Sequence, residues 1–160
     1  MESPENQSAL TVLITGAGTV TCQSVIKGLR AQDEFDVEII TVDMSHDNAG
    51  RYLGDHFETI PGASSPAFVS ELLEICRRRK AELLIPVVDY EFARLAEADE
   101  QFSQLGCRLV LSGADVLDTC DDKWKTYQFF RERGARTPET WLPSMIQSER
   151  VQYPLCLTPR

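Results

Sequence analysis

The sequence lacks a membrane-spanning run, a secretory signal and a clustered set of metal ligands. Its longest apolar runs, such as Leu83 to Val88, are far too short to cross a bilayer. The first residues, Met1 to Ser8, are polar and acidic, without the basic and apolar regions of a signal peptide. We therefore expect a soluble chain with no membrane partner, in which residues 1–9 form a disordered lead-in.

Cysteine and histidine are too dispersed to form a zinc site. A structural zinc needs about four clustered ligands, and the sequence has no CxxC pair and only two histidines. The five cysteines are Cys22, Cys76, Cys107, Cys120 and Cys156. An odd number of scattered cysteines is typical of reduced, mostly buried thiols, so we expect a cytoplasmic protein.

Positive charge is also scarce, because the formal net charge is −9. A chain of that charge repels phosphate backbones, which argues against a nucleic-acid partner. The one basic run, Arg77 to Lys80, falls where a helix is expected to end, and cations there complement the helix dipole. The length of 160 residues suits one domain with a short appendage.

Short apolar runs alternate with helical segments over residues 10–113. We expect strands at Leu10–Thr15, Val37–Val42, Phe57–Ile60, Leu83–Val88 and Arg108–Leu111. We expect helices at Val20–Ala31, at Pro66–Lys80 with Ser64 or Ser65 as its cap, and from the cap Asp89 to Leu105, ended by Gly106. Strands joined through helices pair in parallel. The predicted fold class is therefore α/β, a Rossmann-like parallel sheet with helices on both faces.

Residues 114–160 do not extend this alternation. The pattern predicts a helix at Ala114–Thr119, a second helix from the cap Asp121 or Asp122 through Arg133, and a final strand at Tyr153–Leu157. This helical and β appendage needs something else to pack on.

The first predicted strand is followed at once by Gly16-Ala17-Gly18, and the second ends at Asp43. Glycines allow a tight turn and a close approach of backbone N–H groups to an anion, and an acidic residue at that strand end can bind a ribose. A full dinucleotide fingerprint needs a third glycine where this chain has Thr21. Gly16, Gly18 and Asp43 are thus either cofactor-binding residues or the parts of a tight first turn.

Three further charged residues stand at predicted helix starts. Asp89 and Glu91 follow the fourth strand, at the sheet edge that hosts ligands in open α/β folds, although a carboxylate there also caps a helix. Lys123 begins a helix, where a cation is electrostatically unfavourable, and such a residue is a mild indication of function.

Together these residues resemble the amino-terminal region of ATP-grasp proteins of the carbamoyl-phosphate synthase large-subunit type. The matching stretches are VLITGAG (Val12–Gly18), VDMSHDNAGRYLGDHFETIP (Val42–Pro61), LLIPVVDYEFARLA (Leu83–Ala96), DKWKTYQFFRERGARTPET (Asp122–Thr140) and YPLCLTPR (Tyr153–Arg160). The resemblance implies a pre-ATP-grasp domain over residues 10–113 and the start of the ATP-grasp fold over residues 114–160.

The same resemblance implies roles for several residues. Lys123 looks like the family lysine that contacts the ATP phosphates, and Glu91 and Asp89 lie in a segment near the site of the small-molecule acceptor substrate. Thr158 stands where the family strand has a lysine. The family uses ATP and magnesium, but its glycine-rich loop, magnesium ligands and catalytic arginine would fall beyond Arg160. We therefore expect a ligase platform that is inactive alone and works with a complementing ATP-grasp chain or as a homo-oligomer.

Two other classes fit parts of the sequence. An NAD(P)-binding Rossmann module, epimerase-like or redox-sensing, fits VLITGAG and Asp43, but the chain has no Tyr-x-x-x-Lys pair. A non-catalytic interaction subunit fits the aromatic stripe of Trp124, Tyr127 and Phe130, although such a stripe is more often internal packing.

Overall fold

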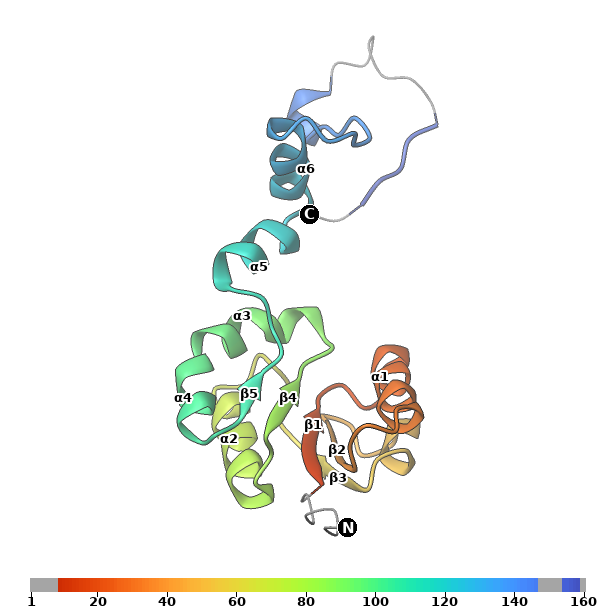
Figure 1. Cartoon of the computed structure of the whole chain (residues 1–160). Helices are drawn as coiled ribbons and strands as arrows, with labels where there is room; N and C mark the ends of the chain where they lie inside the picture. Colours follow the sequence, from red (N-terminus) through yellow and green to blue (C-terminus); the bar gives the residue numbers. More distant parts are fainter. Residues whose placement is uncertain (1–8, 147–153, 159–160) are drawn as a thin grey trace, which may run out of the picture. The chain divides into compact units, whose positions relative to one another are not determined.

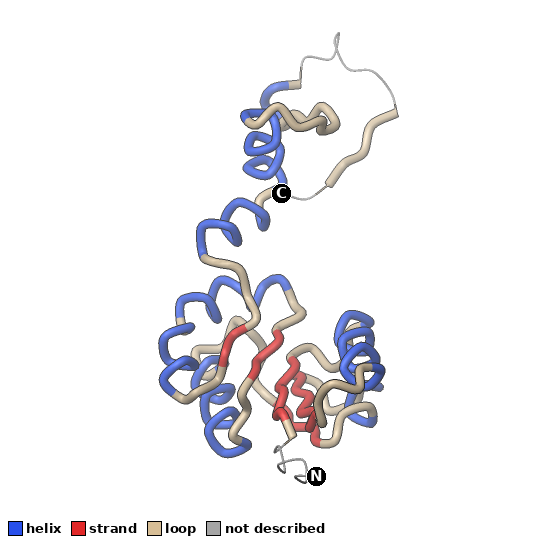
Figure 2. Tube along the Cα trace, in the orientation of Figure 1, coloured by secondary structure: helices blue, strands red, loops and turns tan. Residues whose placement is uncertain are grey.

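The structure is a computed structural model that describes residues 9–146 and 154–158 (Figures 1 and 2). The chain divides into two compact units between Ser112 and Gly113, and each is described by itself. The expected lead-in, residues 1–9, lies outside the described residues except for Ala9.

The first unit is built on a parallel five-stranded sheet of order β3-β2-β1-β4-β5. Its strands are β1 (Leu10–Ile14), β2 (Val37–Asp43), β3 (His56–Thr59), β4 (Leu83–Ile85) and β5 (Arg108–Leu109). β1 lies between β2 and β4, with Leu13 opposite both Ile40 and Leu84. The predicted α/β fold with a parallel sheet is confirmed.

Helices cover both faces of this sheet, as predicted (Figure 1). They are α1 (Val20–Ala31), the short 3-10 helix η1 (Ala49–Tyr52), α2 (Phe68–Arg79), α3 (Asp89–Glu97) and α4 (Asp99–Gln104). Side chains alternate between the faces. Val12 and Ile14 pack with α1, whereas Leu13 packs with α2, α3 and α4.

Several predicted boundaries in this unit differ from the observed ones, most of them by one or two residues. The fourth strand stops at Ile85, because Pro86 has no N–H to donate to a ladder. Neither Ser64 nor Ser65 caps α2; Ser65 instead accepts hydrogen bonds from Ala67 and Phe68 in a preceding turn, and Ala67 is the N-cap.

The predicted helix from Asp89 to Leu105 is two helices, α3 and α4. Ala98 separates them, and its N–H bonds the Leu95 carbonyl, which tightens the turn and redirects the chain. Asp89 is the first residue of α3 and not its cap, since the cap position is Val88. Gly106, at φ +77°, ends α4 as predicted.

The second unit contains α5 (Ala114–Asp121), α6 (Lys123–Glu132) and the 3-10 helix η2 (Pro143–Met145). Asp122 caps α6, as predicted, by accepting hydrogen bonds from the N–H groups of Trp124 and Lys125. Trp124 and Tyr127 pack together with ring centroids 5.3 Å apart, while Phe130 is 43% exposed. Tyr127 is the one buried side chain among the described residues of this unit.

The predicted strand at Tyr153–Leu157 is not found where it can be assessed. Tyr153 lies outside the described residues, and Pro154–Leu157 are loop. A strand exists only when its N–H and C=O groups pair with a neighbouring strand, and the described part of the second unit offers none. Among the described residues, no helix has the length and apolar character that a membrane crossing requires.

The 3-10 helix η1 packs directly against the loop after β1. A Cβ atom at Gly50 would lie 1.9 Å from the carbonyl oxygen of Ala17, so the two backbones touch and only glycine fits. The Ala17 N–H in turn donates to the Val42 carbonyl at 3.1 Å. Three segments distant in sequence thus fix one turn.

We expect Gly50→Ala to lower the free energy of unfolding by roughly 1–3 kcal/mol, because a rigid backbone must move to admit the methyl group. Gly28→Ala is the matched control, since Gly28 is a helical glycine with no atom within 4 Å of its would-be Cβ. That variant should gain roughly 0.5–1 kcal/mol. Urea denaturation of both variants is the measurement, and equal stabilities would contradict this direct packing.

Candidate functional site

The strand order points to the carboxyl ends of β1 and β4 as the expected place of a ligand crevice. The chain leaves β1 toward α1 on one face and leaves β4 toward α3 on the other, so the connections diverge there. Open α/β sheets bind ligands where the order reverses in this way. The residues that follow these strands are therefore the first candidates for a site.

The turn after β1 has a conformation that requires glycine. Gly16 has φ +62°, and a Cβ there would lie 2.5 Å from a Val88 methyl group, so β1 and β4 approach closely. Thr19 then caps α1: its hydroxyl donates to the Gly16 carbonyl at 2.8 Å and accepts from the Cys22 N–H at 3.1 Å. Gly16 is thus needed for the shape of the crevice, whatever ligand it takes.

Asp43 holds the same turn from the end of β2. Its Oδ2 accepts a hydrogen bond from the Gly18 N–H at 2.8 Å, and its Oδ1 accepts one from the Ser45 N–H at 2.9 Å. The carboxylate therefore lies against a backbone donor that a dinucleotide fold offers to a pyrophosphate. This negative charge disfavours a pyrophosphate at the turn, and binding of a cofactor by Gly18 or Asp43 stays a prediction.

Glu91 is the buried acid of the crevice. Only 6% of its surface is exposed, and its Oε2 accepts a 2.5 Å hydrogen bond from the Thr15 hydroxyl. Thr15 Oγ1 accepts from the Val87 N–H at 3.2 Å. Burial raises the pKa of Glu91 to about 7, the Thr15 hydrogen bond acts in the opposite direction, and the negative charge of Asp43 adds to the rise.

The second carboxyl oxygen of Glu91, Oε1, differs from Oε2 in its hydrogen bonding. No hydrogen bond to Oε1 is formed by the described residues, and none of their buried side-chain oxygens lacks a partner. Oε1 must therefore reach solvent. A nearly buried carboxyl group with one oxygen fixed and the other partly exposed can bind a ligand or exchange a proton.

The other predicted site residues are placed differently. Asp89 is exposed at the start of α3, close in sequence to Glu91 but outside its hydrogen-bond group. Lys123 is exposed at the start of α6, in the second unit, and is described with that unit alone. The structure thus brings Gly16, Gly18, Asp43 and Glu91 to one edge of the sheet.

Thr15 is the site residue that sequence reasoning missed. The sequence predicts Thr15 only as the last residue of a buried strand. In the structure, its hydroxyl group links the end of this strand to Glu91. The available signal was a hydroxyl residue at the end of an apolar strand, directly before the glycine turn.

Cys22 lies beside this crevice but is not a nucleophile. It is fully buried in the first turn of α1, and burial, followed by the charge of Asp43, raises its pKa to about 11. The thiol is therefore protonated at neutral pH and packs as a small apolar group.

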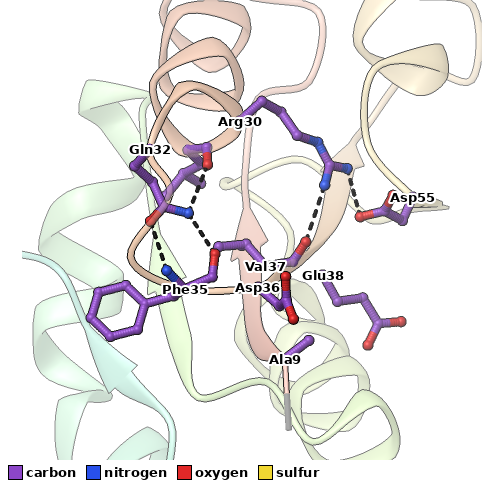
Figure 3. Close-up of a pocket in the computed structure, with 9 residues that line it drawn as sticks. Ala9, Arg30, Gln32, Phe35, Asp36, Val37, Glu38 and Asp55 are labelled. Carbon is purple, nitrogen blue, oxygen red and sulfur yellow. Dashed lines mark hydrogen bonds and ion pairs between the residues drawn. The ribbon is translucent and has the colours of Figure 1, made fainter. Parts of the chain in front are cut away.

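A shallow hollow of about 500 Å³ lies at the opposite, amino-terminal edge of the sheet (Figure 3). Two of its charged groups bind each other: Arg30 donates to Asp55 at 2.6 Å, and it also donates to the Val37 carbonyl at 3.0 Å. The Gln32 side-chain amide donates to the Phe35 carbonyl and accepts from the Phe35 N–H. The hollow is held by structural contacts and is not the candidate site.

The described residues contain no group of three or more His, Cys, Asp or Glu side chains placed to hold a metal ion. A magnesium site made of three such side chains therefore does not fit this part of the chain.

Comparison with known proteins gives a family match over the first unit. The family model described as "PylC-like, N-terminal domain" matches residues 12–110, more than half of the chain. No curated protein matches the chain.

Solved structures share the fold at low sequence identity. Glycinamide-RNase-transformylase T from Mycobacterium tuberculosis has TM-score 0.53 and 17% identity, over 77% of this chain and 35% of that one. N5-carboxyaminoimidazole synthetase from Staphylococcus aureus, solved with ADP, has TM-score 0.55 and 14% identity, over 78% and 30%. The biotin carboxylase domain of a single-chain bacterial carboxylase has TM-score 0.54 and 20% identity, over 78% and 29%. This chain thus spans about a third of the length of these proteins.

The raised pKa of Glu91 has a consequence for stability. Since the folded state keeps its proton up to about pH 7 whereas an ordinary glutamate loses it near 4.5, the folded state binds more protons between these values. The contribution of Glu91 to the free energy of unfolding is therefore complete below about pH 4.5. It is lost as the pH rises through about 7.

We expect the stability of the native chain, relative to Glu91→Gln, to fall by on the order of 2–3 kcal/mol across this window. Glutamine keeps the shape and accepts the Thr15 hydrogen bond but does not titrate. Urea denaturation at a series of pH values measures the difference, in which other titrating groups cancel. Parallel pH profiles would show that Glu91 titrates normally.

Proposed function

The chain belongs to the PylC-like N-terminal domain family, and from this premise we propose that it is the platform of an ATP-grasp carboxylate–amine ligase. Such ligases activate a carboxylate as an acyl phosphate, which an amine then attacks. The observation that carries the proposal is Glu91, a nearly buried acid with one open oxygen at the carboxyl-edge crevice.

The crevice supplies the part of the site that meets the acceptor substrate. Gly16 lets β1 and β4 approach each other, and Asp43 fixes the turn between β1 and α1 through the Gly18 N–H. Glu91 then presents Oε1 at a position held from both strands. A fixed polar atom in a narrow crevice orients a small substrate better than one on a mobile side chain.

Lys123 is the proposed contact to the ATP phosphates. It is exposed at the start of α6, and no described residue forms an ion pair with it. An exposed ammonium group suits a charge-assisted contact to a polyphosphate. Asp89, exposed near Glu91, is a further candidate for substrate contact.

Three finer assignments belong to the same proposal. The resemblance favours the carbamoyl-phosphate synthase type within the ATP-grasp proteins. Magnesium and the remaining phosphate contacts come from a complementing ATP-grasp lobe or from a second copy of this chain. The proposed location is cytoplasmic. The single buried side chain in the described part of the second unit supports the need for such a lobe, because so small an apolar core does not hold a fold alone.

The phosphate role of Lys123 can be tested through the neighbouring Trp124. We expect Mg-ATP to change the tryptophan fluorescence saturably, and Lys123→Ala to weaken this binding at least about tenfold through loss of a charge-assisted contact. Lys125→Ala is the matched control: it removes the same charge from the same helix, but Lys125 is bound to Asp118 at 2.6 Å. Its affinity for ATP should be unchanged.

Equal ATP affinity of Lys123→Ala and the native chain would remove the phosphate role, as would no saturable binding at all. A parallel titration with NADH and NADPH tests the competing proposal, a nicotinamide-binding Rossmann module. Saturable binding of either dinucleotide at micromolar levels, with none of ATP, would replace the ligase proposal by a nicotinamide-binding module.

A further inference from the structure

The direction of the hydrogen bonds around Thr15 determines what Glu91 can do. Thr15 Oγ1 accepts the Val87 N–H, and its own proton has one acceptor within reach, Oε2 of Glu91. Oε2 therefore acts as an acceptor in both protonation states of the carboxyl group. Any proton that Glu91 carries must sit on Oε1, the oxygen that keeps some contact with solvent.

The charges around the carboxyl group favour a cationic ligand. Asp43, from β2, is the charged group that acts on Glu91, and it is negative. Arg94, on the same helix as Glu91, is turned away, since its guanidinium donates to the carbonyls of Ala63 and Ser65. Cys22, from α1, is a protonated thiol. A ligand cation would thus meet two carboxyl groups and no competing positive side chain from these elements.

We propose that Thr15 is a positioning residue, and that it holds Glu91 so that Oε1 accepts a proton from the ammonium group of the acceptor amine. This inference rests on the proposed function and adds to it the form in which the acceptor binds. The ligand class is a primary ammonium ion, recognised at Oε1 by a charge-assisted hydrogen bond.

The proton transfer balances without a further reactant. One N–H bond of the ammonium group breaks, its electron pair stays on nitrogen, and an O–H bond forms at Oε1. The neutral amine is then the nucleophile that an acyl phosphate requires, and Glu91 later returns its proton to solvent. A carboxyl group that titrates near neutral pH is well matched to this exchange, because both of its forms are populated.

Methylammonium is the probe, and tetramethylammonium, which has no N–H group, is its control. We expect methylammonium to shift the backbone amide signals of Val87 and Glu91 saturably in NMR spectra of the native chain, and tetramethylammonium not to. Glu91→Gln should weaken methylammonium binding at least about tenfold, the loss of one charge-assisted hydrogen bond.

The pH profile separates positioning from mere structure. Methylammonium affinity should rise as the pH increases through about 7, where Glu91 ionises. Thr15→Val removes the hydrogen bond that favours the ionised form, so this midpoint should move to higher pH. Thr15→Ser keeps the hydroxyl and should keep the native midpoint, which also serves if Thr15→Val fails to fold.

Equal responses to the two amines, or an unmoved affinity in Glu91→Gln, would overturn the inference. So would a native midpoint in a folded Thr15→Val, or a midpoint displaced in Thr15→Ser. No nucleotide enters this experiment, and Lys123 is unchanged in all of its variants. Loss of methylammonium binding with ATP binding intact would therefore refute the inference alone, and the reverse result would refute the phosphate role alone.

Discussion

The hydrogen bond between Thr15 and Glu91 is the contact on which the candidate site depends. It joins the end of β1 to the first turn of α3, across 76 positions of sequence and across the point where the strand order reverses. A buried carboxyl group costs free energy unless a donor meets it. Thr15 supplies that donor on one oxygen only, and the described residues form no hydrogen bond to the other oxygen.

The rest of the crevice can be understood as support for this contact. Gly16 permits the close approach of β1 and β4, and the Gly50 backbone lies directly against the Ala17 carbonyl. Asp43 accepts a hydrogen bond from the Gly18 N–H. Gly16 and Gly50 thus serve the shape of this edge of the sheet, where Asp43 and Glu91 bring two carboxyl groups. The same geometry explains why a partial glycine motif after a first strand is poor support for dinucleotide binding when the acid of the second strand folds back onto it.

Local chemistry made much of the fold predictable. The bounds of α1 are those expected from the sequence, because a glycine turn and the cap residue Thr19 mark its start. The break between α3 and α4 could not be foreseen, since Leu95 and Phe102 keep helical spacing through Ala98. Thr15 was missed for a related reason: its partner is chosen by strand pairing, which a single sequence does not display. Glu91 could be proposed as a site residue from the sequence because its position directly after β4 follows from the predicted topology.

The candidate site depends on Glu91 being a buried carboxyl group that titrates near neutral pH, with Oε1 partly exposed. Carbon-13 NMR of the Glu91 side-chain carboxyl group, followed across a pH titration of the native chain, measures this property. We expect a midpoint of about 7. A midpoint near 4.5, the ordinary value for glutamate, would mean that the group is solvated and that the Thr15 contact does not bury it.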